Sequence, residues 1–600
     1  MSLSSMWKPR RTFAECDAIL TAPGMPFETE TRLVNGQVQR VYKHLYSSIR
    51  EFWLFFSSQH REKTYVVYED RRLSYGDVLS GSQHAARIFE RVYGVRKGDR
   101  VAICSRNLPE YLVAFWACHL IGAVSVMVNA WLPFEPLTYC LEKADSRLIL
   151  VDAERADIVA PTIPNLRRDG VAGVLVWDTE VLHAGWDGLR LWSDVMRLRD
   201  DQLGLLEPPH VENVVMDPED DATIFFTSGT TGLPKGVLST QRQFLTNILN
   251  ARIGSLRTIL RNGDDLPAVT ESKEPQKAVL ISVPFFHVAG TTSLTMLATS
   301  MGMKIILMRK WDMVKAVSLV RAENVRTAGG VPAIVADLLD SPLAGHPFET
   351  LIFGGSPAHD RLPQMARMAW PSANMSQTYG LTEANSISVS ITGKDYEARP
   401  TSTGLPSVVN DLLIVRNNKT VPNGEEGEIW LRGPNVMKCY WKDPEATAKA
   451  LTPDGWLKTG DLGVLDNEGF LYIRDRIKDL INRGGENIDS TSVENAIHGD
   501  DRINQVAAVG VPDPRLGELV AAVVSPKASH RGQVKGEEII EMVRKSLPHY
   551  AVPVMVVVVD EPFELTPSHK IKKEPLRALA RKEWERRQSK SSQIHMQARL

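Results

Sequence analysis

Apolar and polar positions along the first 360 residues follow two different periods. Short continuous apolar runs predict buried strands, at residues 100–104, 148–152, 278–286, 303–308 and 351–355. Segments with helical spacing lie between them. In residues 329–340, Pro332 suits the first helical turn, and one apolar face follows, made of Ile334, Val335, Leu338 and Leu339. This alternation of strands and helices predicts layered α/β structure.

The apolar stretch Leu112–Leu132 contains 21 residues without a charge, which by length alone could span a bilayer. His119, Gly122 and Asn129 interrupt it, and residues 122–129 have the β-branched composition of a strand. We therefore interpret the stretch as a buried helix, a turn and a strand, and we expect no transmembrane segment.

The pattern changes towards the C-terminus. Residues 428–433 and 469–475 are short apolar runs around turn signals such as Asn423-Gly424, which predict antiparallel strands. After residue 477 a smaller set follows, with predicted strands at 506–511, 518–526 and 552–560 and a helix at 536–547. The sequence thus predicts two domains: a large N-terminal domain, 1–477, of several sheets in layered β/α subdomains, and a small α+β C-terminal domain, 478–600. The basic tail from Arg577 predicts a helix that runs into a disordered end.

Composition narrows the class of protein. A chain of 600 residues is too long for a single core, and 43% hydrophobic with 24% charged residues is typical of a globular enzyme. Lys and Arg number 70 against 72 Asp and Glu, which disfavours nucleic acid or an anionic membrane as the main partner. The five cysteines are scattered without metal-ligand spacing, and the N-terminus lacks the apolar block of a secretory signal. We expect a reducing compartment and no zinc site.

The segment Thr227–Gly236, "TSGTTGLPKG", follows directly after the apolar run 224–226. Glycines allow backbone N–H groups to approach an anion closely, and a lysine adds positive charge, so the segment predicts a phosphate-binding loop. The nucleotide pattern G-x-x-x-x-G-K-[ST] is absent, because Lys235 follows Pro234 and precedes Gly236. The segment is therefore a phosphate loop of another kind.

Further polar clusters interrupt apolar surroundings. In "YGLTE", a tyrosine that can stack on a base stands beside a hydroxyl and a carboxylate that can hold phosphate and Mg²⁺, namely Tyr379, Thr382 and Glu383. In "TGD", Asp461 can accept both hydroxyls of a ribose. The alternatives are an ordinary turn for the first cluster and an aspartate in a glycine turn for the second.

Three other features have equally plain alternatives. Residues 474–488 hold basic side chains and a glycine pair, at Arg476, Lys478, Gly484 and Gly485, and could form a charged hairpin. Three lysines near the end of the chain, Lys570, Lys572 and Lys573, could form a solvated basic face. His287 stands among apolar neighbours and could be a packed core residue.

Taken in order, these segments resemble the adenylate-forming superfamily, which comprises acyl- and aryl-CoA ligases, firefly-type luciferases and adenylation domains of peptide synthetases. The resemblance runs from about residue 40 to about 580. It rests on the motifs "TSGTTGxPKG" at 227–236, "YGxTE" at 379–383, "TGD" at 459–461, "R-x-K-D" at 476–479 and the terminal "K-I" at 570–571. His569 stands where the family frequently has glycine.

The resemblance implies a role for each matching residue. The loop would be a lid over the ATP β- and γ-phosphates, formed by Thr227, Ser228, Gly229, Thr230, Thr231, Gly232 and Lys235. Adenine would stack on Tyr379, next to Gly380 and beside Gly354, Gly355 and Ser356. Asp461 and Arg476 would hold the ribose, Thr382 an α-phosphate oxygen, and Glu383 the Mg²⁺.

The resemblance also implies roles at the domain boundary and in the acyl site. Lys570 would be the cation that meets the charge developing on the α-phosphate, and Lys478 would be the hinge of a mobile small domain. Gly484-Gly485 would approach the pantetheine channel, and His287 would gate the thiol at the acyl pocket wall. That pocket is expected near residues 328–333, 354–357 and 376–378.

The expected function is that of an acyl-CoA ligase using ATP, Mg²⁺ and coenzyme A on a fatty or aryl acid. No carrier-protein domain follows Lys570, which favours free coenzyme A. Two alternatives stay open: a luciferase or stand-alone carrier-loading enzyme, and a nucleotide-binding protein without catalysis.

The last three residues, Ala598-Arg599-Leu600, resemble the S-K-L peroxisomal address. They predict a peroxisomal location, with the peroxisomal import receptor as a partner. Without this address, the expected location is cytoplasmic. The alternative is an ordinary frayed tail.

Overall fold

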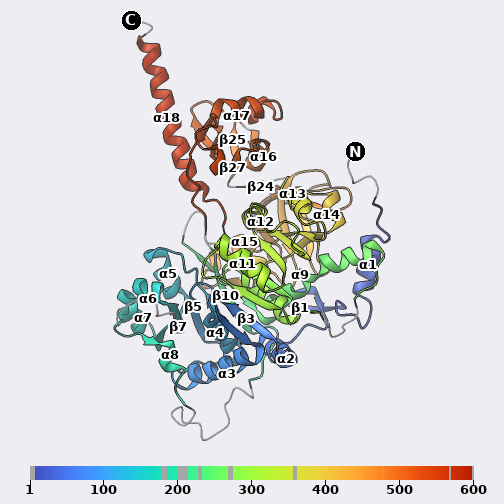
Figure 1. Ribbon diagram of the computed structural model, residues 1–600, viewed down its shortest axis with the longest axis vertical. Helices are drawn as coiled ribbons and strands as arrows, with labels where there is room; N and C mark the ends of the chain where they lie inside the picture. Colours follow the sequence, from blue (N-terminus) through green and yellow to red (C-terminus); the bar gives the residue numbers. More distant parts are fainter. Residues whose placement is uncertain are drawn as a thin grey trace.

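The computed structural model describes residues 7–177, 186–199, 214–227, 233–267, 274–355, 361–477, 479–484, 486–566 and 569–597. Figure 1 shows a broad body, which holds the N-terminal part of the chain, and a smaller C-terminal lobe with a long terminal helix. The fold is mixed α/β, with several sheets in the large part and one sheet in the small part, as the sequence predicted.

Two large sheets, both mostly parallel, form the centre of the body. The first contains, in spatial order, β22 (Cys439–Tyr440), β11 (Lys235–Thr240), β10 (Asp221–Thr227), β6 (Val124–Met127), β5 (Arg100–Cys104), β7 (Ser146–Asp152), β8 (Gly173–Trp177) and β9 (Arg190–Leu191). The second contains β18 (Leu405–Pro406), β17 (Val389–Thr392), β16 (Asn374–Tyr379), β15 (Thr350–Gly354), β14 (Val325–Gly330), β12 (Ala278–Ile281), β13 (Lys304–Leu307), β3 (Thr64–Tyr68) and β4 (Arg71–Ser74).

Smaller sheets complete the described chain. The hairpin near the N-terminus pairs β1 (Thr29–Val34) with β2 (Gln37–Tyr42). An antiparallel sheet contains β20 (Lys419–Thr420), β19 (Asp411–Arg416), β21 (Gly427–Arg432), β23 (Leu457–Leu465) and β24 (Leu471–Arg476). The sheet of the small lobe contains β26 (Glu486–Ile488), β25 (Ile481–Arg483), β28 (Gly517–Pro526), β27 (Ile503–Asp513) and β29 (Met555–Val558).

The helices cover these sheets. In the body they are α1 (Phe13–Leu20), α2 (Ile49–Gln59), α3 (Tyr75–Arg91), α4 (Pro109–Leu120), α5 (Phe134–Ala144), α6 (Ala153–Val159), α7 (Ile163–Arg168), α8 (Trp192–Val195), α9 (Gln241–Asn262), α10 (Met296–Ser300), α11 (Met313–Ala322), α12 (Pro332–Leu339), α13 (Leu362–Ala369), α14 (Lys394–Ala398) and α15 (Pro444–Ala450). Those of the small lobe are α16 (Ser490–Ile497), α17 (Gly536–Val543) and α18 (Lys573–Gln597). Short 3-10 or π turns lie at η2 (Ala160–Thr162), η5 (Ala289–Thr295), η6 (Thr382–Ala384), η7 (Ala528–His530) and η8 (His549–Ala551).

The uncharged stretch Leu112–Leu132 is the end of α4, a turn at Gly122 with φ 70°, and strand β6. Both elements are buried in the same apolar core, in which Trp53 of α2 stacks on Trp116 of α4 with ring centroids 4.3 Å apart. In the described part of the chain, no helix has the length and apolar character needed to cross a membrane. The interpretation as helix, turn and strand is confirmed.

The run 278–286 is only partly a strand, because β12 ends at Ile281. Beyond it, Asn107 donates its side-chain amide to the carbonyl of Val283 at 2.9 Å and accepts the N–H of Phe285 at 2.8 Å. Pro284, between them, has no N–H to continue a ladder. The apolar residues 283–286 therefore form a fixed loop that leads to His287.

The sheet of the small lobe is covered on both faces, which explains its continuous apolar runs. Along β27, Val506 and Ala508 pack with α16 and α17, while Ala507 and Val509 pack with Ala580 of α18. The basic tail that was expected to begin as a helix is α18, whose first three turns belong to this core.

Candidate active site

The polar clusters meet beyond the carboxyl ends of the parallel strands, the usual ligand position of open α/β sheets. Tyr379 ends β16, and its hydroxyl donates to Asp461 Oδ2 at 2.8 Å. Asp461 of β23 pairs with Arg476 of β24, and its Oδ1 lies 3.4 Å from the arginine Nε. Burial and the neighbouring Asp461 raise the pKa of Tyr379, so the phenol stays protonated and keeps donating. The predicted adenine and ribose residues thus form one connected wall.

A second connection links the base of the hydroxyl-rich loop to the proposed metal ligand. Glu383 Oε1 accepts a hydrogen bond of 2.7 Å from the hydroxyl of Tyr440, and Lys235 Nζ lies 5.1 Å from the centre of the Tyr440 ring. Thr227 and Lys235 face each other at the open end of the β10–β11 hairpin, where the Thr227 hydroxyl donates to the Lys235 carbonyl at 3.3 Å. Tyr440 could not be predicted from the sequence, because Glu383 lies 57 residues away along the chain and Lys235 lies still farther.

Glu383 suits a hard cation. Loss of solvent is the largest influence on its carboxyl group and raises its pKa, so a nearby positive charge would stabilise the ionised form. Among the described residues, no group of three or more His, Cys, Asp or Glu side chains could hold a metal ion. A magnesium ion at Glu383 would therefore take its other ligands from ATP phosphates and water, the usual arrangement for this ion.

Two glycines of the predicted site are required by close contacts. A Cβ on Gly380 would lie 1.4 Å from the carbonyl oxygen of Ser386, and one on Gly354 would lie 2.5 Å from Thr378 Oγ1. Gly355, which follows β15, has φ 77°, and a Cβ there would lie 3.5 Å from Lys570 Cε and 3.7 Å from its Nζ. Lys570, from the small lobe, therefore reaches the carboxyl end of β15 in the second large sheet.

His287 lies at the end of the loop that Asn107 holds, and its Nε2 is buried without a hydrogen-bond partner among the described residues. Burial, and second the charge of Lys570, lower the pKa of His287 to about 3. The imidazole is therefore neutral at neutral pH and lies near enough to Lys570 for the lysine charge to act on it. Asn107 was missed from the sequence, although it follows the strand end at Cys104 within the stretch "SRN".

We expect this histidine to make the protein sensitive to acid. A folded-state pKa near 3 against an ordinary 6.5 means that the unfolded chain binds an extra proton between these values. Stability is then fully present above pH 6.5 and falls as the pH drops towards 3. The His287→Gln variant should lose less stability than the parent from pH 7 to 4.5, by about 2–3 kcal/mol in urea unfolding. Parallel pH curves for the two proteins would contradict the prediction.

The three terminal lysines are not equivalent, which rules out a uniform solvated face. Lys573 Nζ lies 2.7 Å from Glu494 Oε1 and 2.7 Å from Ser490 Oγ, with both charged side chains about one-fifth exposed. Lys572 pairs with the exposed Glu564. Only Lys570 of the three approaches Gly355.

This difference predicts separate effects on stability. Lys573→Ala leaves the largely buried Glu494 carboxylate without its cation. The free energy of unfolding should therefore fall by ~3 kcal/mol, the lower end of the range for breaking a buried ion pair. Lys572→Ala, the matched control, should cost less than ~1 kcal/mol because its pair is exposed. Urea denaturation of both variants tests this, and equal losses would show that the Lys573 pair is effectively solvated.

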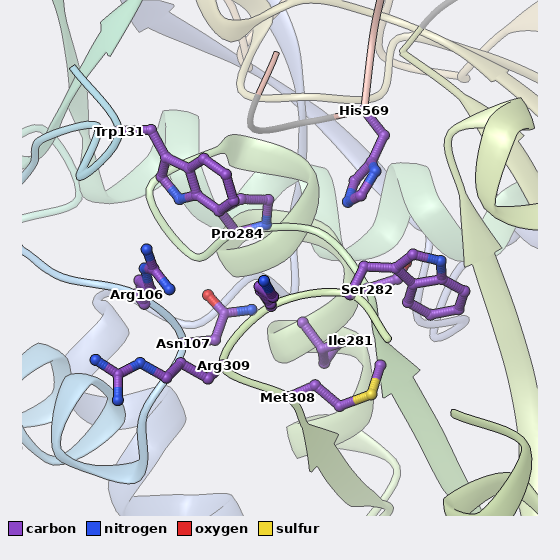
Figure 2. Close-up of a pocket in the computed structure, with 11 residues that line it drawn as sticks. Arg106, Asn107, Trp131, Ile281, Ser282, Pro284, Met308, Arg309 and His569 are labelled. Carbon is purple, nitrogen blue, oxygen red and sulfur yellow. The ribbon is translucent and has the colours of Figure 1, made fainter. Parts of the chain in front are cut away.

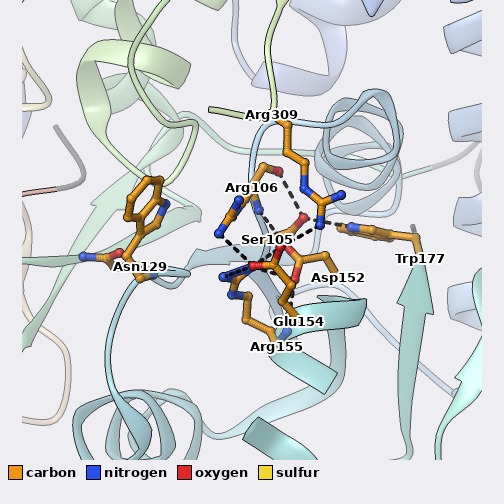
Figure 3. Close-up of polar contacts among 9 residues, drawn as sticks. Ser105, Arg106, Asn129, Asp152, Glu154, Arg155, Trp177 and Arg309 are labelled. Atoms are coloured by element: carbon orange, nitrogen blue, oxygen red, sulfur yellow. Dashed lines mark hydrogen bonds and ion pairs between the residues drawn. The ribbon is translucent and has the colours of Figure 1, made fainter. Parts of the chain in front are cut away.

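A polar pocket lies at the ends of β5, β12 and β13 (Figure 2). Figure 3 shows the ionic network that supports one side of it. Glu154 accepts from three arginines, at 2.7 Å from Arg106, 2.8 Å from Arg155 and 2.8 Å from Arg309. The Arg106 guanidinium lies 5.2 Å from the centre of the Trp131 ring. The network joins the ends of three strands that are far apart in sequence.

Several predicted site residues fall outside the described part of the chain: Ser228, Gly229, Thr230, Thr231, Gly232, Ser356, Lys478, Gly485 and the terminal Ala598–Leu600. Gly484 is described, with φ 62°, on the turn between β25 and β26, where its N–H donates to the Leu516 carbonyl at 2.7 Å. Its contacts there lie within the small lobe. Thr382 opens η6, one residue before Glu383.

Comparison with known proteins defines the class. Residues 56–441 match the family described as AMP-binding enzyme, and residues 492–570 match the AMP-binding enzyme C-terminal domain. The first match covers more than half of the chain. The chain belongs to the AMP-binding enzyme family, and its activity is that of an AMP-forming acid–CoA ligase.

Individual relatives agree with this class. A feruloyl-CoA synthase of an Amycolatopsis species is 32% identical over 526 residues, which are 86% of this chain and 95% of the relative. A long-chain-fatty-acid–CoA ligase of Mycobacterium tuberculosis is 30% identical over 513 residues, covering 85% and 93%. The solved o-succinylbenzoate coenzyme A synthetase of Bacillus subtilis, in complex with ATP and a magnesium ion, is 25% identical, with a TM-score of 0.70 over 87% of this chain and 98% of that one.

Proposed function

We propose that the chain joins a fatty or aryl carboxylic acid to coenzyme A in two steps at this site. A carboxylate oxygen first attacks the α-phosphorus of ATP, which forms acyl-AMP and releases pyrophosphate. The sulfur of coenzyme A then attacks the acyl carbonyl, so the thioester forms and AMP leaves with the bonding electron pair. The thiol proton passes to solvent.

One observation carries the proposal: Lys570, from the small lobe, approaches Gly355 and His287 of the large domain. Charge develops on the α-phosphoryl oxygens during the first step, and a preorganised cation stabilises that charge. The neutral His287 offers a polar nitrogen where the acyl carboxylate would lie. The lysine and the histidine would thus contact opposite parts of the reacting centre.

The other residues would bind the nucleotide. Tyr379 would stack on adenine. Its hydroxyl donates to Oδ2 of Asp461, and Asp461 would accept the ribose hydroxyls, which Arg476 would also contact. Thr382 would bind an α-phosphate oxygen. Glu383 would hold Mg²⁺, which supplies positive charge to the phosphates, and Lys235 with Thr227 would contact the departing pyrophosphate.

The acid is proposed only as a class. The relatives above are named for an aryl acid and for long-chain fatty acids. Gly330 of β14 has no side chain, and a Cβ there would lie 3.1 Å from Val283 Cγ1 and 3.4 Å from Ser282 Oγ. A larger residue would push against Val283 and Ser282, so the glycine keeps these two residues in place beside the proposed acyl site. A panel of cinnamic, benzoic and straight-chain acids, assayed for AMP release with coenzyme A, tests the class, and release of ADP in place of AMP would overturn the proposal.

The sequence alone left open a luciferase-like or carrier-loading enzyme built on the same adenylation chemistry. Release of AMP that depends on free coenzyme A distinguishes the ligase from both.

We also propose that the boundary between domains lies at residue 477, with Lys478 as the hinge. Strands β24 and β25, which end and begin at Arg476 and Ile481, belong to different sheets, which supports that boundary.

The peroxisomal location stays a prediction. It rests on Ala598–Leu600 alone, and the relatives described above are bacterial. Deletion of these three residues from a tagged protein in a eukaryotic cell tests it, and an intact protein found in the cytoplasm would contradict it.

A further inference from the structure

His569 has a backbone conformation that is unfavourable for any residue with a side chain. Its φ is 57°, in the left-handed region that favours glycine. A tight turn on Thr566 fixes this conformation. The N–H of His569 donates to the Thr566 carbonyl at 2.8 Å, and the N–H of Lys570 donates to Thr566 Oγ1 at 3.0 Å. A glycine would adopt this conformation more easily than histidine.

The imidazole enters the polar pocket of the large domain. Figure 2 shows its ring pointing into the pocket from a segment of the small lobe, while the other walls, such as Asn107, Pro284 and Met308, come from the large domain. The ring meets the Trp311 indole edge-on, with centroids 6.5 Å apart and planes at 78°. This contact crosses between the two lobes one residue before Lys570.

Trp311 is a fixed partner for this contact. Its indole Nε1 donates to Asp337 Oδ2 of α12 at 2.7 Å. By comparison, another contact between the lobes, the ion pair of Arg361 with Asp501, has side chains 53% and 89% exposed and contributes little. Burial lowers the pKa of His569, which favours the neutral form of the ring.

We propose that His569 is a positioning residue for Lys570. Its ring, packed against Trp311, holds the backbone of His569 and Lys570 on the large domain and so directs the Lys570 ammonium to Gly355 and His287. His569 keeps a backbone conformation that favours glycine because the contact of its ring with Trp311 fixes the position of Lys570. The inference rests on the proposed role of Lys570 in adenylation.

The test measures the two half-reactions separately. Acid-dependent exchange of pyrophosphate into ATP reports adenylation, and conversion of supplied acyl-AMP by coenzyme A reports thioester formation. His569→Gly removes the ring and relieves the backbone, so we expect the kcat of exchange to fall about tenfold. The KM for ATP should be unchanged, because the residues proposed to bind the nucleotide are intact. The Tm should also be unchanged. His569→Phe, which keeps a ring, should retain most of the exchange rate.

The partner residue supplies a double-mutant cycle. Trp311→Leu should lower the exchange kcat to a similar extent, and adding His569→Gly to it should cause little further loss, since both remove one contact. Exchange at the parental rate in His569→Gly, or losses that multiply in the double variant, would overturn the positioning role. Lys570→Ala runs alongside: if it exchanges normally, the proposed function of the lysine fails first. If it is inactive while His569→Gly is normal, only the positioning role is rejected.

Discussion

Replacing Lys570 with alanine should lower the rate of acid-dependent pyrophosphate exchange by about 10²–10³-fold, the usual loss when one preorganised contact to a developing charge is removed. The ammonium lies beside Gly355, next to the space in which the α-phosphate and the carboxylate would meet. Removal should leave binding of ATP nearly unchanged, because the residues proposed to bind adenine and ribose are Tyr379, Asp461 and Arg476. The KM for ATP should therefore change much less than kcat.

Supplied acyl-AMP separates the two steps in the same variant. We propose that the small domain adopts another arrangement for thioester formation, in which Lys570 has left the site. The variant should then convert acyl-AMP and coenzyme A at close to the parental rate. Lys572→Ala is the control, since it removes a neighbouring exposed charge. Loss of both half-reactions with an intact fold would reject the alternating arrangement, and full exchange activity would reject the role of the lysine.

Glu383→Gln should reduce exchange by a similar factor of about 10²–10³ at ordinary magnesium concentrations. The amide oxygen can still accept the hydrogen bond of Tyr440, so the fold around η6 should survive. The negative charge that would bind the cation is lost, and higher Mg²⁺ should restore part of the rate. Titration of the exchange rate with Mg²⁺ measures this.

The matched control is Glu468→Gln, an exposed glutamate that pairs with Arg399. Its magnesium dependence should equal that of the parent. An unchanged magnesium dependence in Glu383→Gln would show that this carboxylate does not hold the ion.

Much of the fold could be predicted because the core elements carry local patterns. The run 100–104 is β5, the stretch around Leu112–Leu132 is α4 and β6, and the face of Ile334, Val335 and Leu338 is buried in α12. The run 278–286 was predicted too long, since a loop held by a distant side chain looks as apolar as a strand. Local pattern does not reveal which partner holds a segment.

The same limit applies to the site. The ordered motifs located Tyr379, Glu383, Asp461 and Lys570 before any geometry was known. The supporting residues were not visible, because Tyr440 contacts Glu383 and Asn107 contacts the loop before His287, and both partners are far away in sequence. His569 was noticed only as a departure from glycine, and its ring contact becomes evident only in three dimensions.

The stacked pair of Trp53 and Trp116, with planes at 6°, offers an optical signal for one part of the molecule. Two indoles this close should couple excitonically in the far ultraviolet. The circular dichroism signal of this coupling should vanish when the core of the large domain melts. Trp584 is the only tryptophan after residue 477, and its Nε1 donates to the Pro512 carbonyl at 2.9 Å. Its fluorescence, isolated by a Trp584→Phe difference spectrum, would follow the undocking of α18. The intact chain thus has two independent optical signals, one for melting of the large domain and one for undocking of α18 in the small domain.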